Sequence, residues 1–315
     1  MIGNAHRFQP LIYTAEGKNQ VFSPKFSRIE NERVKTEKPN MKIKVNLHTH
    51  TCRCKHASGT LDEYCQAAIK AGISILGFSE HCPFPDGEYP DSRMDFCELP
   101  QYVADIEAAR IKYPQLTILA GLELDYRPIL GRRYYREEFL EKYPFDYLIA
   151  GAHYLPAANG QPAQYVKVED PMSVKTLRAF VRESLRIMES GLIDYLAHPD
   201  LTARCLPVWT EDVRAAYLDI IDAAAALNMP LEINGYGPRK PWIDTPEGRR
   251  AQYPWIHFWE LVAEHGGIEV VAGSDAHRPE DVWGNLDDIY EFAANLGLTI
   301  RNYELAQKII KRRRG

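Results

Sequence analysis

The chain has 315 residues, of which 45% are hydrophobic and 26% are charged, and its net charge is −5. This length suits one large globular domain or two small ones. No apolar run approaches the roughly 20 residues of a membrane span, and the acidic balance argues against a general nucleic-acid binder.

The first 41 residues are polar and broken by proline and charge, so we expect an N-terminal extension or arm. They also lack the compact apolar core of a secretory signal, so we expect the protein to stay in the cytoplasm. In such a chain the six cysteines are expected to be reduced thiols, Cys52 and Cys54 included.

From residue 42 to residue 315, short apolar runs alternate with longer helical patterns, which is typical of a parallel α/β fold. Seven strands are expected, ending at Leu47, Phe78, Glu123, Ala152, Ala197, Asn234 and Ser274. Apolar positions repeat at helical spacing over residues 60–71, 99–112, 174–190, 211–227 and 255–265. The pattern predicts a seven-unit β/α barrel, with a doubly wound open sheet as the alternative.

Three further segments are interpreted from their composition. Residues 84–96 and 245–254 are rich in proline and glycine and are expected to be loops after strands, where barrel enzymes carry their function. The basic ending at residues 308–315 is expected to be a solvated tail.

Histidines and selected carboxylates follow the expected strands, at the point where each strand ends. The motifs are "HTHTCRCKH", "SEH", "GLELD", "GAH", "AHPD" and "GSDAH". They supply nine donors, namely His48, His50, His56, His81, Glu123, His153, His198, Asp275 and His277. A lone histidine there is more often a satisfied polar residue than a ligand. So many titratable groups at one rim would be strongly destabilising if they were buried unpaired, so the pattern predicts a centre for zinc, manganese or iron.

These motifs make the chain similar to the polymerase and histidinol phosphatase (PHP) family, above all to its histidinol-phosphatase branch, from Val45 to the helix after His277. The resemblance implies a distorted, seven-stranded TIM-like barrel that holds three divalent or transition metal ions. It places His48, His50, Glu123 and Asp275 around the first ion, Glu123, His153 and His198 around the second, and His56, His81 and His277 around the third. Glu123 would therefore bridge two ions.

The resemblance also suggests how phosphate is held. "HPDLTAR" and "EINGYGPRKP" are similar to segments whose arginines grip the phosphate in this branch, which implies that role for Arg204 and Arg239. Arg93 in "DSRMDF" is a third candidate, with a solvated loop arginine as the alternative. A guanidinium suits phosphate because its planar fork donates two parallel hydrogen bonds.

The implied activity is that of a phosphatase acting on a small phosphate monoester, with L-histidinol phosphate, an intermediate of histidine biosynthesis, as the expected substrate. The expected nucleophile is a hydroxide that bridges the metals, with Asp275 as one possible proton donor to the leaving alkoxide. Two alternatives stay open. One is a PHP-type phosphodiesterase or nuclease acting on nucleotides, and the other is a non-catalytic PHP binding module.

Overall fold

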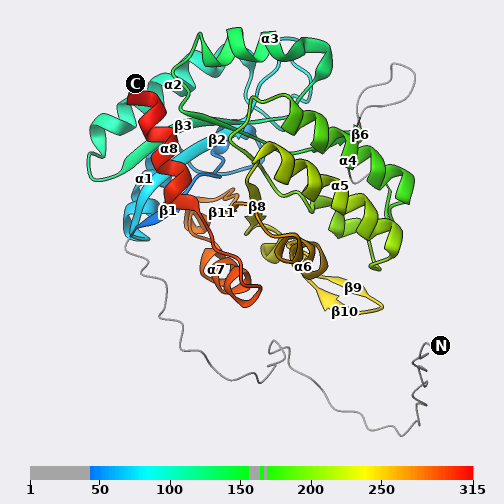
Figure 1. The fold of residues 1–315 in the computed structure, drawn as a ribbon. Helices are drawn as coiled ribbons and strands as arrows, with labels where there is room; N and C mark the ends of the chain where they lie inside the picture. Colours follow the sequence, from blue (N-terminus) through cyan, green and yellow to red (C-terminus); the bar gives the residue numbers. More distant parts are fainter. Residues whose placement is uncertain (1–42, 156–163, 167–168, 315) are drawn as a thin grey trace, which may run out of the picture. The chain divides into compact units, whose positions relative to one another are not determined.

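The structure is a computed structural model that describes residues 43–155, 164–166 and 169–314. Seven parallel strands form one sheet in the order β1-β2-β3-β4-β7-β8-β11 (Figure 1). Their bounds are Lys44–Asn46 (β1), Ile73–His81 (β2), Thr117–Leu124 (β3), Tyr147–Ala150 (β4), Tyr195–Leu196 (β7), Leu231–Asn234 (β8) and Val270–Gly273 (β11). A bridge between Thr49 and Ala276 brings the two edges of the sheet together. The barrel is therefore confirmed over the open sheet, whereas the arm expected at residues 1–41 lies outside the described residues.

Helices surround this barrel on the outside (Figure 1). Those that follow the expected pattern are α1 (Leu61–Lys70), α2 (Leu99–Lys112), α4 (Val174–Glu189), α5 (Glu211–Leu227) and α6 (Ile256–His265). The others are α3 (Gly131–Tyr135), α7 (Leu286–Asn295) and α8 (Asn302–Arg314). Within the described ranges, no helix combines the length and apolar composition needed to cross a bilayer.

Local signals in the sequence explain where the helices begin. Thr60 caps α1, because its side chain accepts the backbone N–H of Glu63 while the Glu63 carboxylate accepts the N–H of Thr60. Thr210 caps α5 by accepting the backbone N–H of Val213, and Asn228 ends that helix in the left-handed conformation with a φ of 51°.

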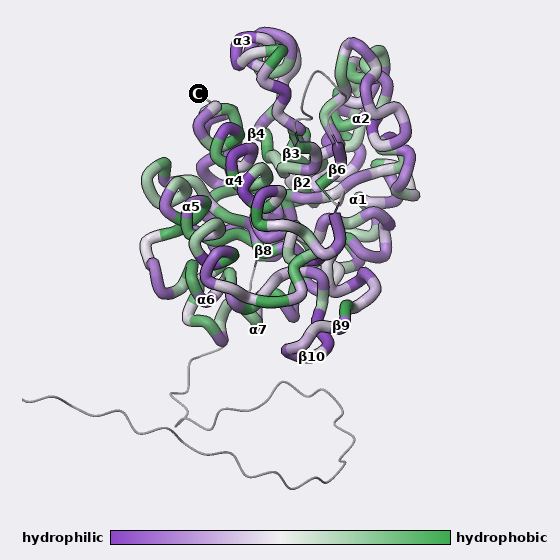
Figure 2. The backbone as a smooth tube through the Cα atoms, turned by 90° about the vertical axis from the view of Figure 1, so that its right-hand side faces the viewer, coloured by the Kyte–Doolittle hydropathy of each residue, from purple (hydrophilic) through white to green (hydrophobic). Residues whose placement is uncertain are grey.

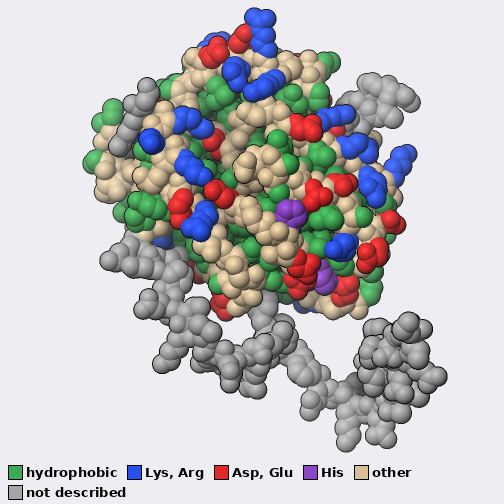
Figure 3. All heavy atoms as spheres, viewed as in Figure 1, with side chains coloured by type: hydrophobic (Ala, Val, Ile, Leu, Met, Phe, Trp, Pro, Cys, Tyr) green, Lys and Arg blue, Asp and Glu red, His purple; other side chains and the backbone are tan. Residues whose placement is uncertain are grey.

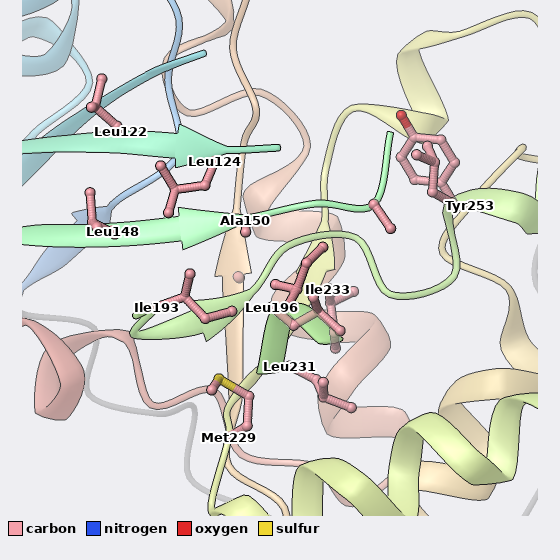
Figure 4. Close-up of a cluster of buried hydrophobic side chains, with 14 of the residues drawn as sticks. Leu122, Leu124, Leu148, Ala150, Ile193, Leu196, Met229, Leu231, Ile233 and Tyr253 are labelled. Atoms are coloured by element: carbon pink, nitrogen blue, oxygen red, sulfur yellow. The ribbon is translucent and has the colours of Figure 1, made fainter. Parts of the chain in front are cut away.

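Two apolar layers hold the barrel together. Figure 4 shows part of the outer layer, where Leu122, Leu148, Leu196 and Leu231 project from neighbouring strands. In Figure 2 the central strands are largely hydrophobic, whereas hydrophilic residues gather on the outer turns. The alternation of side chains along each strand therefore divides the core between the barrel interior and the space beneath the helices.

Large side chains fill the barrel interior. Tyr147 donates a hydrogen bond from its hydroxyl to the Leu47 carbonyl at 2.7 Å. Its ring occupies space that Gly121 leaves free, because a Cβ on Gly121 would lie 2.6 Å from that ring. The interior is thus a packed core, and any site must lie at an open end of the barrel.

Helix α8 closes the amino-terminal end of the barrel, which corrects the expectation of a solvated tail. Leu305 and Ile309 pack with the interior strand residues, and Ile309 is fully buried. Arg312 lies 2.8 Å from an oxygen of Asp194. The one-turn spacing of the two apolar residues marks an amphipathic helix, but the surrounding lysines and arginines obscured it.

The side chain of Asn302 joins the two edge strands. Its amide oxygen accepts the Ala272 N–H at 2.7 Å, and its amide nitrogen donates to the carbonyls of Ala272 and Val45 at 2.7 and 3.0 Å. Val45 belongs to β1 and Ala272 to β11. We call this junction the barrel seam.

Residues 245–254, expected as a loop, contain part of a short hairpin. Its antiparallel strands are β9 (Ile243–Thr245) and β10 (Gly248–Arg250). A second hairpin pairs β5 (Tyr154–Leu155) with β6 (Gln164–Tyr165). The strands of both hairpins have only two or three residues, too few to show an alternating apolar pattern, which is why neither hairpin was expected.

Candidate metal centre

All nine predicted donors lie together at the carboxyl end of the barrel. Parallel pairing places His81 of β2 opposite Glu123 of β3. On the other side, the backbone N–H of His50 donates to the Ala276 carbonyl at 2.9 Å, which ties the first histidine motif to the last. His198 and Asp275 have positive φ angles of 31° and 49°, a strained conformation that is typical of functional residues.

Glu123 lies at the middle of this group. Its carboxylate is surrounded by five histidine nitrogens, at 2.9 Å (His198 Nε2), 3.0 Å (His81 Nδ1), 3.4 Å (His50 Nε2), 3.5 Å (His153 Nε2) and 3.6 Å (His48 Nε2). Asp275 Oδ1 lies 3.3 Å from His50 Nε2 and 3.6 Å from His48 Nε2. The central position of Glu123 among these nitrogens is the one expected of a carboxylate that two ions share.

The donors fall into compact sets, within each of which the candidate ligand atoms lie no more than 4.8 Å apart. The sets that contain only predicted ligands are His56, His81 and His277; His48, His50 and Glu123; His48, His198 and Asp275; and His81, Glu123 and His153. The first is identical to the set expected for the third ion. The others overlap the two remaining expected sets.

Two of the imidazoles are oriented by carboxylates that contact their Nδ1 atoms, on the side of the ring away from the donor group. The Nδ1 of His48 lies 2.7 Å from Glu232 Oε1, and that of His153 lies 2.9 Å from Asp125 Oδ1. A ring that donates its Nδ1–H in this way presents a lone pair on Nε2. Both Nε2 atoms face the centre of the donor group, as a metal site requires.

Some buried nitrogens have no hydrogen-bond partner among the residues that the structure describes, and they test whether a metal ion fits here. They are His48 Nε2, both ring nitrogens of His50, His81 Nδ1 and His198 Nδ1. His81 Nδ1 lies close to Glu123 but without hydrogen-bond geometry. Leaving such groups unpaired is costly, and a cation satisfies the forward-facing ones directly. The donor set therefore fits divalent metal ions.

Electrostatics within the group are strongly perturbed. Burial and the neighbouring His50 lower the pKa of His81 well below its usual value. Although burial disfavours the charged form of His153, Asp125 and Glu123 raise its pKa to about 9. Burial likewise opposes ionisation of Glu123, but the surrounding histidines hold its pKa well below the usual range. Cations would serve the carboxylates in place of these protons.

Arg93 lines the same cavity, which has a volume of about 170 Å³. Its Nη1 donates to the Cys82 carbonyl at 2.7 Å, and its Nη2 donates to Asp125 at 3.0 Å. The side chain is buried, and its Nε has no partner. The alternative of a solvated loop arginine is therefore wrong.

Arg239 and Arg204 lie elsewhere. Arg239 donates from Nη1 to the carbonyls of Gly235 and Gly284 at 2.8 and 2.9 Å, and from Nη2 to that of Ser274 at 2.6 Å. These contacts of the two terminal nitrogens brace the neighbouring loops and do not support the phosphate contact expected of Arg239. Arg204 lies near the Tyr165 hydroxyl at 3.4 Å, and neither arginine lines the cavity.

Sequence reasoning missed three residues of the site. Glu232 and Asp125 hold the imidazoles described above, and Lys240 lines the cavity with its Nζ 4.0 Å from the Tyr236 ring. Two signals were available. Glu232 is the one charged residue of the strand "LEIN", and Asp125 follows Glu123 at the two-residue spacing that repeats a direction in an extended chain.

The comparisons with known proteins agree with this geometry. A model of the PHP domain matches residues 46–235. A probable histidinol-phosphatase of Deinococcus radiodurans is 32% identical, covering 79% of this chain and 92% of that protein. The histidinol-phosphatase of Bacillus subtilis is 27% identical, covering 75% and 94% respectively.

Among solved structures, the fold is similar to that of a histidinol phosphate phosphatase from Lactococcus lactis complexed with zinc, L-histidinol and phosphate. The TM-score is 0.64 at 18% identity, covering 82% of this chain and 95% of that one.

Proposed function

The chain belongs to the PHP domain family, and on that premise we propose that it is a metal-dependent phosphatase that hydrolyses L-histidinol phosphate to L-histidinol and phosphate. The observation that carries the proposal is the cavity itself. Nine nitrogen- and oxygen-bearing side chains converge at one rim, with buried nitrogens unpartnered and an arginine beside them. The histidinol-phosphatase relatives support the choice of substrate.

We assign the nine donors to three ions in the sets that the family resemblance implies, with Glu123 between two of them. Zinc, manganese and iron all suit imidazole and carboxylate ligands. When bound, such ions neutralise the phosphate oxygens and lower the pKa of water. Glu123 and Asp275 would offset the charge of the ions, and the cavity beside the donors would admit the substrate.

Arg93 is the residue we propose to orient the phosphoryl group. Arg93 lines the cavity, and Asp125 and the Cys82 carbonyl fix its two terminal nitrogens, while its buried Nε has no hydrogen-bond partner among the described residues. A fixed donor orients phosphate without losing side-chain entropy on binding. Lys240 adds a second positive charge to the cavity lining, and Arg204 lies beside the hydroxyl of Tyr165, which also lines the cavity.

Aromatic side chains form part of the cavity wall. The tyrosines that line it are Tyr154, Tyr165, Tyr236 and Tyr253. A flat ring can stack against such walls while tyrosine hydroxyls reach its polar atoms. The imidazole of L-histidinol phosphate is such a ring, so the wall suits the body of this substrate.

A nucleic-acid substrate fits less well. The chain is acidic overall, and on the face drawn in Figure 3 acidic and basic side chains intermingle. The cavity of about 170 Å³ is of a size that suits a small ester.

The test is a set of phosphate esters assayed with the same metal-loaded protein. L-histidinol phosphate should give the highest kcat/KM, an aryl monoester a lower value, and bis(4-nitrophenyl) phosphate the lowest. Chelator-treated protein should be inactive and should recover with added metal. Preference for the diester would refute the monoesterase assignment, and equal turnover of all monoesters would refute the choice of substrate.

A further inference from the structure

We propose that Glu232 is a positioning residue of the metal centre, which fixes His48 and His198 in ligating orientations without binding an ion itself. The inference rests on the proposed metal-binding function. It concerns the strand beneath the site, which none of the predicted ligands belongs to.

Both oxygens of the Glu232 carboxylate are engaged, and the side chain is fully buried. Oε1 accepts from His48 Nδ1 at 2.7 Å. Oε2 accepts the backbone N–H of His198 at 3.1 Å and the Asn234 side-chain amide at 2.9 Å. One carboxylate on β8 therefore holds a residue that follows β1 and another that follows β7.

These contacts act on metal affinity in two ways. By accepting the Nδ1–H, Glu232 selects the His48 tautomer whose Nε2 lone pair faces the site, and its charge makes that lone pair more basic. By holding the N–H of His198, it secures a backbone whose φ of 31° is strained. Without Glu232, the cost of fixing the His48 tautomer and the His198 backbone would reduce the free energy of metal binding.

The neighbouring residues keep the carboxylate in place. A Cβ on Gly273 would lie 1.9 Å from Glu232 Oε1, so the absence of a side chain there gives Glu232 its space. The Asn234 amide donates to Glu232 and lies 3.2 Å from Asp275 Oδ2. Glu232 is thus linked to three predicted ligands on three different segments.

The competing interpretation is that Glu232 only satisfies buried polar groups. In that case its loss would lower the stability of the metal-free fold and leave metal affinity unchanged. The two interpretations differ in a property that can be measured without turnover, namely the dissociation constant of each ion.

The experiment compares wild type with Glu232→Gln, which keeps the shape of the side chain but removes its charge. Asp146→Asn is the matched control, because Asp146 is also buried but pairs with Arg110 and the Ala120 N–H, away from the donor group. Zinc dissociation constants come from chelator competition. The melting temperature of each metal-free protein measures stability independently.

We expect Glu232→Gln to raise the dissociation constant of at least one zinc ion by about tenfold to hundredfold, as is usual when a residue that holds a metal ligand in place is lost. Asp146→Asn should leave every zinc dissociation constant within about twofold of the wild-type value, even if its melting temperature falls as much as that of Glu232→Gln. Asn234→Ala removes one support of Glu232, together with the contacts of Asn234 to Asp275 Oδ2 and to the Tyr236 N–H, and it should weaken binding of the same ion by a smaller factor.

Zinc constants within twofold of wild type in Glu232→Gln would overturn the inference while leaving the metal centre intact. If that variant shows no unfolding transition, Asn234→Ala decides, and unchanged constants there overturn the inference as well. Wild-type protein that binds none of zinc, manganese and iron would refute the proposed function together with the inference.

Discussion

The Nε2 atoms of His56 and His277 lie 3.0 Å apart, facing each other. Each ring has its Nδ1 against a backbone carbonyl, that of Cys54 at 2.8 Å and that of Asp275 at 3.1 Å. Because both Nδ1 atoms must donate to those carbonyls, both Nε2 atoms present lone pairs to each other. A cation between them converts this repulsion into two bonds.

The first prediction is therefore that the purified protein holds close to three equivalents of transition metal. Nine donors suffice for three ions when one carboxylate bridges and water completes each shell. Elemental analysis of protein prepared without chelator measures the content. Protein that binds at most one ion after reconstitution would contradict the three-ion assignment.

The second prediction concerns Glu123→Gln, which removes the charge at the middle of the donor group while keeping its shape. We expect activity to fall by at least roughly a hundredfold and one ion to bind more weakly. Steady-state kinetics and metal content are measured on the same sample. Near-normal values of both would show that Glu123 does not bridge two ions.

The third prediction is that Arg93→Lys lowers kcat/KM by about tenfold to hundredfold at unchanged metal content, since lysine keeps the charge but loses the planar fork. Arg127→Lys is the control, because both guanidinium groups lie 4.8 Å from the Phe84 ring but Arg127 does not line the cavity. Equal effects of the two changes would remove Arg93 from phosphate recognition.

The fourth prediction is that Arg239→Ala acts on stability. Loss of its charge-assisted bonds to loop carbonyls should lower the free energy of unfolding by about 1.5–3 kcal/mol. Urea unfolding of the metal-free protein measures this, with the exposed Arg249→Ala as control. Inhibition by free phosphate should stay the same. A large rise in the phosphate inhibition constant, with stability unaffected, would restore the phosphate contact expected from the sequence.

The fifth prediction tests the closure of the barrel by α8. Ile309→Ala should cost about 2–5 kcal/mol of unfolding free energy, because the methyl groups it removes fill the interior. The exposed Gln307→Ala on the same helix should cost almost nothing. Per folded molecule, kcat should be unchanged in both variants, since the site lies at the other end of the barrel. A fall in kcat with normal stability would argue against this division.

The strands and the predicted donors could be read from the sequence because each donor motif follows an apolar run. Glu123 and His81 illustrate this, since their strands pair in the register that brings both to one rim. Glu232 could not be read in this way. Strand β8 is buried on both faces, so its residues show no alternation that would distinguish an inward glutamate.

The direction of the Arg239 side chain depends on how separate loops pack, and a sequence motif does not contain that information. Its bracing contacts come from the carbonyls of Gly235, Ser274 and Gly284, which belong to separate loops. Only the packing of those loops decides whether a guanidinium faces the cavity or the backbone. Motif resemblance identified the arginine but could not give its direction.

The barrel seam has a consequence for the order in which the protein can become competent during synthesis. His48 follows the first strand and Asp275 the last, so the donor group combines early and late parts of the chain on either side of the seam. Asn302, which joins those two strands, is translated later still. The segment around Asn302 must therefore leave the ribosome before the seam can close. Until then, a nascent chain that already contains all nine predicted donors lacks the Asn302 contacts that join the two edge strands.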